Sequence, residues 1–417
     1  MMEVVGTTPE TSSAHVALPL SCSYCGERFD TRNRLFAHLR ASQCSDAALK
    51  SHLQAGQRME KVALLIGVSA NAKDWRQALW KALDIARGPG KPSYADQDGA
   101  PGAAFASGDA PALVLEPTVA RCCDVVSFKT EALSSDEERV RWCARANDAL
   151  GGEDAPVQIL GRSGALPTSF TADLSCMRRT FVCVVPISVL LVGKATLPEQ
   201  FNNHSGAAVT SLASANGDER REDSKAASVA ALRRKPVKEQ YEAAFGGGED
   251  GERMLGQFHR LKSILRAYQG EHLFHNFSPG ARLSPGDGAA RRFIYKCRAE
   301  TDVEKRVSAF TVTLDGALVG QLQRMAGLAI AVQRGLLPED YLQSAFSEEM
   351  LLPVPSVPDG TVYLSGCVYR KQFHHLLAPL MSSTAAQKWH RKVEEAVLQR
   401  VHSGAFETWY REELVPW

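Results

Sequence analysis

The sequence predicts an α+β protein whose two halves are separated by a polar insertion and preceded by a small cysteine-containing module. In both halves, short apolar and β-branched runs are mixed with longer segments that carry apolar residues at helical spacing. Between the halves the composition changes to small, polar and charged residues, which is typical of a disordered linker. These observations predict a module at 1–56, one lobe at 57–197, an insertion at 198–250 and a second lobe at 251–417.

Length and composition describe an ordinary globular protein. Of the 417 residues, 44% are apolar and 23% are charged, as is usual for folded domains. No apolar run approaches the roughly 18 residues that span a bilayer, so no membrane partner is expected. The net charge is +1, so any nucleic-acid surface must be a local patch. Most of the ten cysteines are scattered, which predicts reduced thiols in an intracellular protein of the nucleus or cytoplasm, with the mitochondrion left open.

The N-terminal module has the ligand spacing of a zinc finger. The spacing C-x2-C-x12-H-x5-C identifies four ligands, Cys22, Cys25, His38 and Cys44. A hairpin turn brings the first two thiolates together, and a short helix presents the last two ligands, which closes a tetrahedral site for a structural zinc ion. The segment resembles a C2H2-type ββα finger with cysteine as the last ligand. One finger reads only about 3 bp and seldom specifies a DNA site alone. Its partner can therefore be DNA, RNA or another protein.

Both lobes contain strands and helices. In the first lobe, strands are expected at 61–68, 124–130, 157–161 and 179–192, and helices at 74–86 and 137–150, with a Gly- and Pro-rich loop at 88–111. In the second lobe, helices are expected at 252–270, 318–335 and 385–402, and strands at 291–300, 309–316 and 361–369. Two halves of comparable strand and helix content favour the α+β class.

The stretch GEHLFHNFS at 270–278 combines two histidines, an asparagine and two phenylalanines. His272 and His275 are three residues apart and have no acidic or cysteine partner directly after them, which is a weak pattern for a metal site. Aromatic rings and hydrogen-bonding side chains together are typical of RNA-binding surfaces. A buried core loop uses the same residue types. The residue types alone leave these two interpretations open.

Several segments, taken in order, resemble the TruA-type pseudouridine synthases of eukaryotes. The stretch that ends at Ser278 resembles the pattern G-T-H-x-F-H-N-F-T. The other matching segments are 61–68, 157–183, 291–297, 322–346 and 354–369. The segment 157–183 resembles the stretch with F-x-A-R and R-x-Y, and 322–346 resembles the helix with V-R-x-M-V-G. Each motif alone is modest, and the shared order over 61–369 makes the resemblance more specific.

The resemblance implies a two-lobed pseudouridine synthase fold, with a central and mostly antiparallel sheet flanked by helices. It implies that uridine in tRNA or another structured RNA is flipped into a cleft and isomerised to pseudouridine without a cofactor. In the family an aspartate starts cleavage of the glycosidic bond, an arginine pairs with that aspartate, and a tyrosine packs on the base, which rejoins through carbon. The candidates for phosphate contacts are Arg178, Arg179, Arg291, Arg292 and Lys296. Pairing of these cations with nearby acids is the alternative.

The catalytic segment departs from the family pattern R-T-D-x-G-V-x-A. Counting back without a gap from the strand at 125–128 places Glu116 at the aspartate position. Asp109 is the alternative, and it requires an insertion before that strand. A glutamate moves the carboxylate outward by about one methylene, and misplacement by about 1 Å lowers a rate by roughly a hundredfold.

Three further positions depart from the family. The arginine of F-x-A-R is Asp173, and the tyrosine that packs on the base is Phe181. The arginine of V-R-x-M-V-G is Gln323, with Arg324 one place later. One place is about 100° around a helix, so Arg324 should face another direction than Gln323.

Three functions are therefore open. The first is an RNA-binding pseudouridine synthase in which Glu116 or Asp109 carries the chemistry. The second is a catalytically impaired relative that serves as an RNA clamp or as an assembly factor in a ribonucleoprotein. In both, the side chains expected to contact RNA are Phe181, Phe274, His275, Asn276 and Arg324. The third is a zinc-finger regulator that binds nucleic acid.

Overall fold

One sheet of eight strands organises the described part of the chain. In this computed structural model, the described residues are 20–21, 28–29, 34, 59–70, 72, 74–87, 119–133, 135–191, 249–278 and 283–416. The chain divides into two compact units, one formed by Met1–Glu60 with Thr130–Ala132 and the other by Lys61–Lys129 with Leu133–Trp417. In the first unit, β1 (Leu20–Ser21) and β2 (Arg28–Phe29) pair as antiparallel strands.

The strands of the large sheet come from both predicted lobes. They are β3 (Met59–Val68), β4 (Ala120–Glu131), β5 (Val157–Arg162), β6 (Cys176–Pro186), β7 (Gly270–Leu273), β8 (Arg291–Asp302), β9 (Val307–Leu314) and β10 (Val362–Tyr369). Their order is β5-β3-β4-β10-β6-β9-β8-β7. β10 pairs in parallel with β4, and the pairings of β3 with β5, β10 with β6, β6 with β9, β9 with β8 and β8 with β7 are antiparallel. The predicted α+β class with a mostly antiparallel sheet is confirmed.

The helices of the described residues flank this sheet. They are α3 (Trp75–Arg87), α5 (Asp136–Leu150), α6 (Ala172–Ser175), α9 (Glu249–Arg266), α10 (Gln321–Gln333), α11 (Asp340–Ser344), α12 (Lys371–Met381), α13 (Thr384–Arg400) and α14 (Phe406–Trp409). Short helical turns occur at Gly152–Asp154, Ile187–Val189, His275–Phe277, Gly288–Ala290, Val401–Ala405 and Tyr410–Leu414. Local sequence begins two of the longer helices, because the Ser135 and Ser383 side chains accept hydrogen bonds from Glu138 N and Ala386 N.

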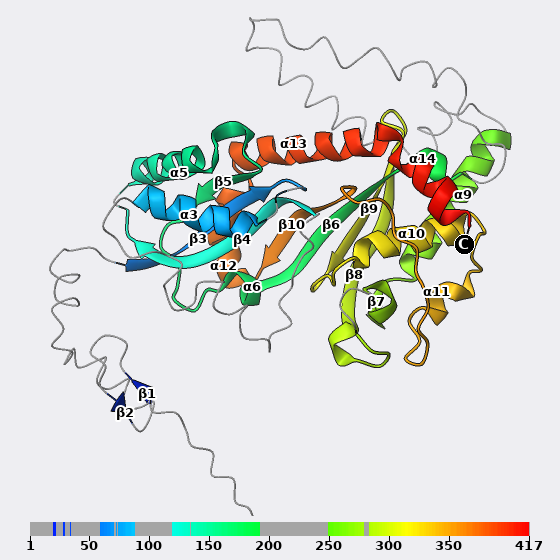
Figure 1. The fold of residues 1–417 in the computed structure, drawn as a ribbon, viewed down its shortest axis with the longest axis horizontal. Helices are drawn as coiled ribbons and strands as arrows, with labels where there is room; N and C mark the ends of the chain where they lie inside the picture. The colour runs from blue at the N-terminus through cyan, green and yellow to red at the C-terminus, as the bar shows by residue number, and fades with distance from the viewer. Residues whose placement is uncertain are drawn as a thin grey trace, which may run out of the picture. The chain divides into compact units, whose positions relative to one another are not determined.

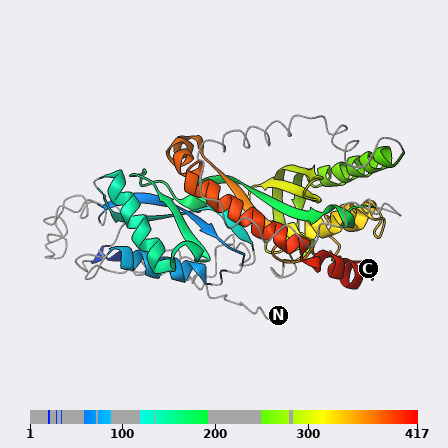
Figure 2. The ribbon, with the colours of Figure 1, turned by 90° about the horizontal axis from the view of Figure 1, so that it is seen from above.

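The register of the central strands shows which helices share a face. Tyr363 of β10 donates its hydroxyl to Glu394 of α13, at 3.2 Å. The next residue, Leu364, must point to the other face, where its partner Phe181 packs beside Met325 of α10. The two faces of the sheet are therefore named the α13 face and the α10 face. α3 and α5 lie at the β3–β5 end, α9 and α10 at the other end, and α13 runs lengthwise across the sheet (Figures 1 and 2).

Two expectations for single elements change. The strand predicted at 179–192 is wrong beyond Pro186, where β6 ends and Ile187–Val189 forms a helical turn. Proline has no N–H to donate to a neighbouring strand, so it is a poor residue to continue a central strand. β4 begins at Ala120, before the predicted start at 124. The short strand β7 and the helix α12 were not predicted.

Candidate functional site

The candidate site lies on the α10 face, where β4, β10 and β6 run side by side. Arg121, Leu364 and Phe181 stand opposite one another across these strands, so their side chains point to the same face. All three side chains are buried. The described residues before β4 begin at Val119. Both predicted catalytic carboxylates, Glu116 and Asp109, therefore lie outside the described residues. Their roles stay predictions.

An ion pair stands beside this row of side chains. Arg179 is two residues before Phe181 on β6, so it points to the same face. Its Nη2 lies 3.3 Å from Oδ1 of Asp173, at the start of α6. Arg179 is buried and the Asp173 carboxylate is exposed. Burial lowers the pKa of Arg179, but negative groups that include Asp124 and Asp173 outweigh this effect and raise it above the ordinary value.

The arginine–aspartate pair was not anticipated from the sequence. Asp173 occupies the position of the arginine in F-x-A-R, where the sequence showed only a reversal of charge. The structure shows that the reversed charge has an arginine partner six residues later, across the turn from α6 into β6. An acid and an arginine six residues apart are common in any sequence, so the spacing gave no signal.

A second group of charges lies on β4 and α3. Arg121 forms an ion pair with Asp124, and its guanidinium is 4.9 Å from the ring centre of Trp75. The guanidinium of Arg76 is 5.2 Å from the same ring. Burial is the main cause that lowers the pKa of Arg76, and the charge of Arg121 adds to it. Arginines are thus gathered close to the row that contains Phe181, a charge pattern that favours anionic ligands.

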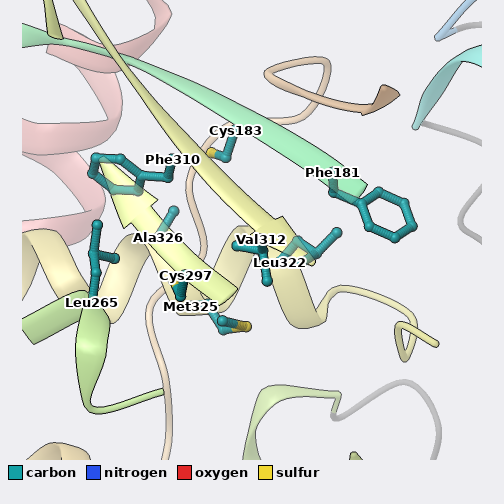
Figure 3. A pocket seen from close by; sticks show the side chains of 9 residues that line it. All are labelled: Phe181, Cys183, Leu265, Cys297, Phe310, Val312, Leu322, Met325 and Ala326. Atoms are coloured by element: carbon teal, nitrogen blue, oxygen red, sulfur yellow. The ribbon is translucent and has the colours of Figure 1, made fainter. Parts of the chain in front are cut away.

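Phe181 lies at one end of a small apolar cavity between the sheet and two helices (Figure 3). The other lining residues are Cys183, Leu265, Cys297, Phe310, Val312, Leu322, Met325 and Ala326. The cavity has a volume of about 10 Å³, which is the lower limit for one water molecule. Burial raises the pKa of Cys183 and Cys297 to about 12, so both thiols stay protonated near neutral pH. This cavity is too small for a nucleobase.

α10 places the two residues of the altered V-R-x-M-V-G pattern differently. Leu322 and Met325 line the cavity. Gln323 is buried, and its carbonyl accepts a hydrogen bond from Val357 N, at 3.2 Å. Arg324 is half-buried and donates to the carbonyl of Gly320, at 3.3 Å. Neither Gln323 nor Arg324 lines the cavity, and the two differ in exposure, as expected for neighbours about 100° apart around a helix. Its contact with RNA stays a prediction.

The GEHLFHNFS stretch has an internal role in this structure. Phe274, His275 and Asn276 are all buried. His275 Nε2 lies 2.9 Å from the carbonyl oxygen of Met350. Asn276 Nδ2 donates to the carbonyls of Ala345 and Met350, both at 3.0 Å, and Asn276 Oδ1 accepts from Leu352 N, at 2.9 Å. These bonds hold the segment 345–352, and the predicted RNA contact of the three side chains remains untested.

Removing the Asn276 amide should destabilise this part of the fold. Asn276→Ala leaves the buried carbonyl of Ala345 and the part-buried N–H of Leu352 without their partner, while the Met350 carbonyl keeps its bond to His275, and an expected loss of about 2 kcal/mol follows. Thermal unfolding measures the change. Ser344→Ala is the matched control, because its hydroxyl makes one exposed bond within α11, and it should change stability by less than about 0.5 kcal/mol. Equal effects of the two substitutions would contradict this role of Asn276.

The five basic residues proposed for phosphate contacts divide into three groups. Arg179 pairs with Asp173, and Arg291 pairs with Glu271 at 2.8 Å. Arg292 donates to two backbone carbonyls. Arg178 and Lys296 are exposed, and among the described residues neither has an acidic group within 4.0 Å. The acid-pairing alternative therefore holds for two of the five.

The described cysteines are free thiols, and the described residues form no cluster of metal ligands. The seven cysteines within the described residues are all free, which confirms the prediction of reduced thiols for these positions. The described residues contain no group of three or more His, Cys, Asp or Glu side chains that could hold a metal ion. Cys22, Cys25, His38 and Cys44 lie outside the described residues, so the predicted zinc site stays a prediction.

Comparisons with known proteins give a distant and partial similarity. Among helices in the described ranges, none is long and apolar enough to cross a membrane. No protein-family model matches the chain. Over 102 residues, the chain is 29% identical to the pseudouridylate synthase 1 homolog of Mus musculus and 28% identical to that of Homo sapiens. The match covers 24% of this chain and 23% of each relative, so the chain spans about a quarter of the length of the curated relatives it matches. The chain is therefore distantly similar, over one segment, to two pseudouridylate synthase 1 homologs.

Proposed function

We propose that this protein binds tRNA or another structured RNA and isomerises uridine to pseudouridine. The observation that carries the proposal is the similarity to the two pseudouridylate synthase 1 homologs. Their name states the reaction and implies an RNA substrate. The eight-stranded, mostly antiparallel sheet with flanking helices is consistent with the fold expected for such an enzyme.

The geometry of the central strands supports a role for Glu116. Glu116 is four residues before Ala120, the first residue of β4. Ala120 pairs with Tyr363, which neighbours the Leu364–Phe181 pair. Adjacent strands are about 4.8 Å apart, so Phe181 is about 10 Å from Ala120. The proposed carboxylate thus shortly precedes β4, and one strand, β10, lies between β4 and the strand that carries the proposed base-packing ring.

In the proposed reaction, a uridine leaves its stack, and Phe181, which is buried in this structure, becomes accessible and packs on the base. The phenylalanine keeps the ring of the family's tyrosine and lacks its hydroxyl. The carboxylate of Glu116, or of Asp109, starts cleavage of the glycosidic bond, and the base rejoins through carbon. Arginines near the site, Arg121 and Arg179 among them, favour the approach of phosphate groups. No cofactor takes part.

A second candidate is a catalytically impaired relative that clamps RNA or helps to assemble a ribonucleoprotein. Two observations favour it. Gln323 replaces the arginine expected beside the carboxylate, and its side chain is buried. Asp173 replaces another family arginine and pairs with Arg179 instead. Both changes replace an arginine of the family's catalytic pattern. They speak against catalysis and leave the proposed RNA binding unaffected.

Pseudouridine mapping separates these candidates. The purified protein is incubated with unmodified cellular RNA, and pseudouridines are located along each transcript. The synthase proposal expects new pseudouridine at defined positions. No product on any cellular RNA, with RNA binding intact, would exclude the enzyme and leave the clamp. Crosslinking that recovers only genomic DNA would exclude both RNA functions and favour the zinc-finger regulator.

The zinc finger is proposed as a separate module. Its support is the donor set, two thiolates, one histidine and a third thiolate, together with the short hairpin of β1 and β2 on either side of Cys22 and Cys25. Cys22→Ser is expected to abolish stoichiometric zinc, measured by metal analysis of the purified protein. Cys143→Ser is the control, since this half-buried thiol is far from the motif in sequence. Unchanged metal content in the Cys22 variant would contradict the ligand assignment.

A further inference from the structure

A patch of aromatic, basic and hydroxyl side chains lies on the α13 face of the sheet. We call it the β8 patch, and it consists of Arg178 and Thr180 of β6, Phe293, Tyr295 and Lys296 of β8, and Thr313 of β9. Lys296, Thr313 and Thr180 stand opposite one another across three strands. Because Thr180 neighbours Phe181, which faces α10, this row points to the opposite face. The patch is thus distinct from the candidate site.

A register shift in β8 produces the patch. Ile294 pairs with Leu314 and Lys296 pairs with Thr313, so Tyr295 is an extra residue without a partner on β9. A bulge of this kind re-aims side chains. In a regular strand, Tyr295 and Lys296 would point to opposite faces. Here Phe293, Tyr295 and Lys296 are all exposed, while Ile294 is buried.

The patch is open to solvent. Phe293 is 39% exposed and Tyr295 is 38% exposed, on the strand next to the sheet edge. Their ring centres are 4.8 Å apart. Gly366 continues the row of Lys296, Thr313 and Thr180, and a Cβ built on it would meet only the Thr180 Cβ, at 4.0 Å, among the described residues. α13 does not cover this part of the sheet.

The charge of the patch is positive. The guanidinium of Arg178 is 4.1 Å from the ring centre of Tyr295. In the described ranges, no acidic group lies within 4.0 Å of Arg178 or Lys296, whereas the neighbouring Arg298 pairs with Glu300 at 3.0 Å. The Thr180 and Thr313 hydroxyls are 3.1 Å apart and offer hydrogen bonds between the two cations and the rings.

We infer that the β8 patch binds a single-stranded segment of RNA. Bases stack on Phe293 and Tyr295, and phosphates contact Arg178 and Lys296. The exposed rings suit the flat, apolar bases of a single strand. The cations, which have no acidic partner among the described residues, suit its anionic backbone. Two copies of the patch packed on each other would bring like charges together, so a second copy of the chain fits less well. The inference rests on the proposed function for RNA as the ligand, and it adds a contact on the face opposite the reaction.

Fluorescence anisotropy with the full-length protein and a labelled uridine-rich single strand tests the inference. Phe293→Ala and Tyr295→Ala should each weaken binding roughly tenfold, and Tyr295→Phe should keep wild-type affinity because the ring remains. Lys296→Ala should lower the slope of affinity against salt by roughly one phosphate contact. Arg298→Ala is the matched charge control for Arg178→Ala, because Arg298 is already paired with Glu300. Arg298→Ala should weaken RNA binding less than Arg178→Ala.

The outcomes separate this inference from the proposed function. Unchanged single-strand affinity in the two alanine ring variants, with pseudouridine formation intact in the wild type, overturns the patch and leaves the synthase. Absence of any RNA binding by the wild type overturns both. Light scattering that shows a change of oligomeric mass in these variants, without a change of RNA affinity, assigns the patch to a second copy and overturns the inference. Equal binding of single-stranded DNA supports the stacking surface but not selection of RNA.

Discussion

Glu116→Gln is expected to lower the rate of pseudouridine formation by at least roughly a hundredfold and to leave RNA affinity nearly unchanged. The glutamine keeps the shape of the side chain and removes the charge that starts cleavage of the glycosidic bond. Binding depends on contacts with phosphates and stacked bases, which the substitution does not touch. Single-turnover rates of pseudouridine formation, measured with enzyme in excess over RNA, separate the chemical step from binding.

Asp109→Asn and Asp173→Asn are the matched variants for this experiment. Each removes one carboxylate without a change of shape. Asp109 is the alternative catalytic residue from the sequence, and Asp173 is the exposed carboxylate that the structure pairs with Arg179 on the α10 face. Asp109→Asn and Asp173→Asn should keep turnover, and loss of turnover in Asp109→Asn instead of Glu116→Gln would assign the chemistry to Asp109. Wild-type rates in all three variants would contradict a catalytic role for any of these carboxylates.

Gly327→Ala is expected to lower the stability of the protein by about 3 kcal/mol, because it inserts a methyl group where backbone already lies. A Cβ at this position of α10 would be 2.2 Å from the carbonyl oxygen of Pro355 and 2.7 Å from its carbonyl carbon. The hydrogen bond from Val357 N to the Gln323 carbonyl holds this backbone against the helix. The segment must therefore move away, and the midpoint of thermal unfolding should fall by several degrees.

Gly256→Ala is the control for this substitution. Gly256 is an exposed glycine inside α9, and a Cβ built on it meets nothing within 4 Å. Alanine favours a helix over glycine by about 1 kcal/mol, so this variant should be slightly more stable than the wild type. If both substitutions stabilised the protein, the backbone of Pro355 would not lie close enough to α10 in solution to exclude a methyl group at residue 327.

Much of the fold follows from the sequence because hydrophobic spacing is local. The expected helix at 74–86 is found as α3, at Trp75–Arg87, and the expected strand at 61–68 is found within β3, at Met59–Val68. The order of the strands does not follow in the same way. β10 lies between β4 and β6 because of pairing between residues far apart in sequence, and apolar spacing carries no information on that pairing.

The candidate site is less predictable, because the same residue types serve different roles. His275 and Asn276 suit an RNA surface as well as a buried clamp, and only burial and the bonds to 345–352 show the internal role. The position of Lys296 on the same face as Phe293 and Tyr295 depends on a bulge, and no glycine or proline in β8 signals that bulge. The pairing of Asp173 with Arg179 depends on the turn between α6 and β6.

The most direct test of the proposed function follows the hydrogen on the uridine carbon that forms the new bond. RNA whose uridines carry tritium at that carbon is incubated with an excess of the purified wild-type protein, and tritium released to water is counted. Isomerisation exchanges this hydrogen, so the wild type should release tritium, and release should stop in the variant that lacks the catalytic carboxylate. Tight binding of the same RNA without release of tritium would contradict the synthase.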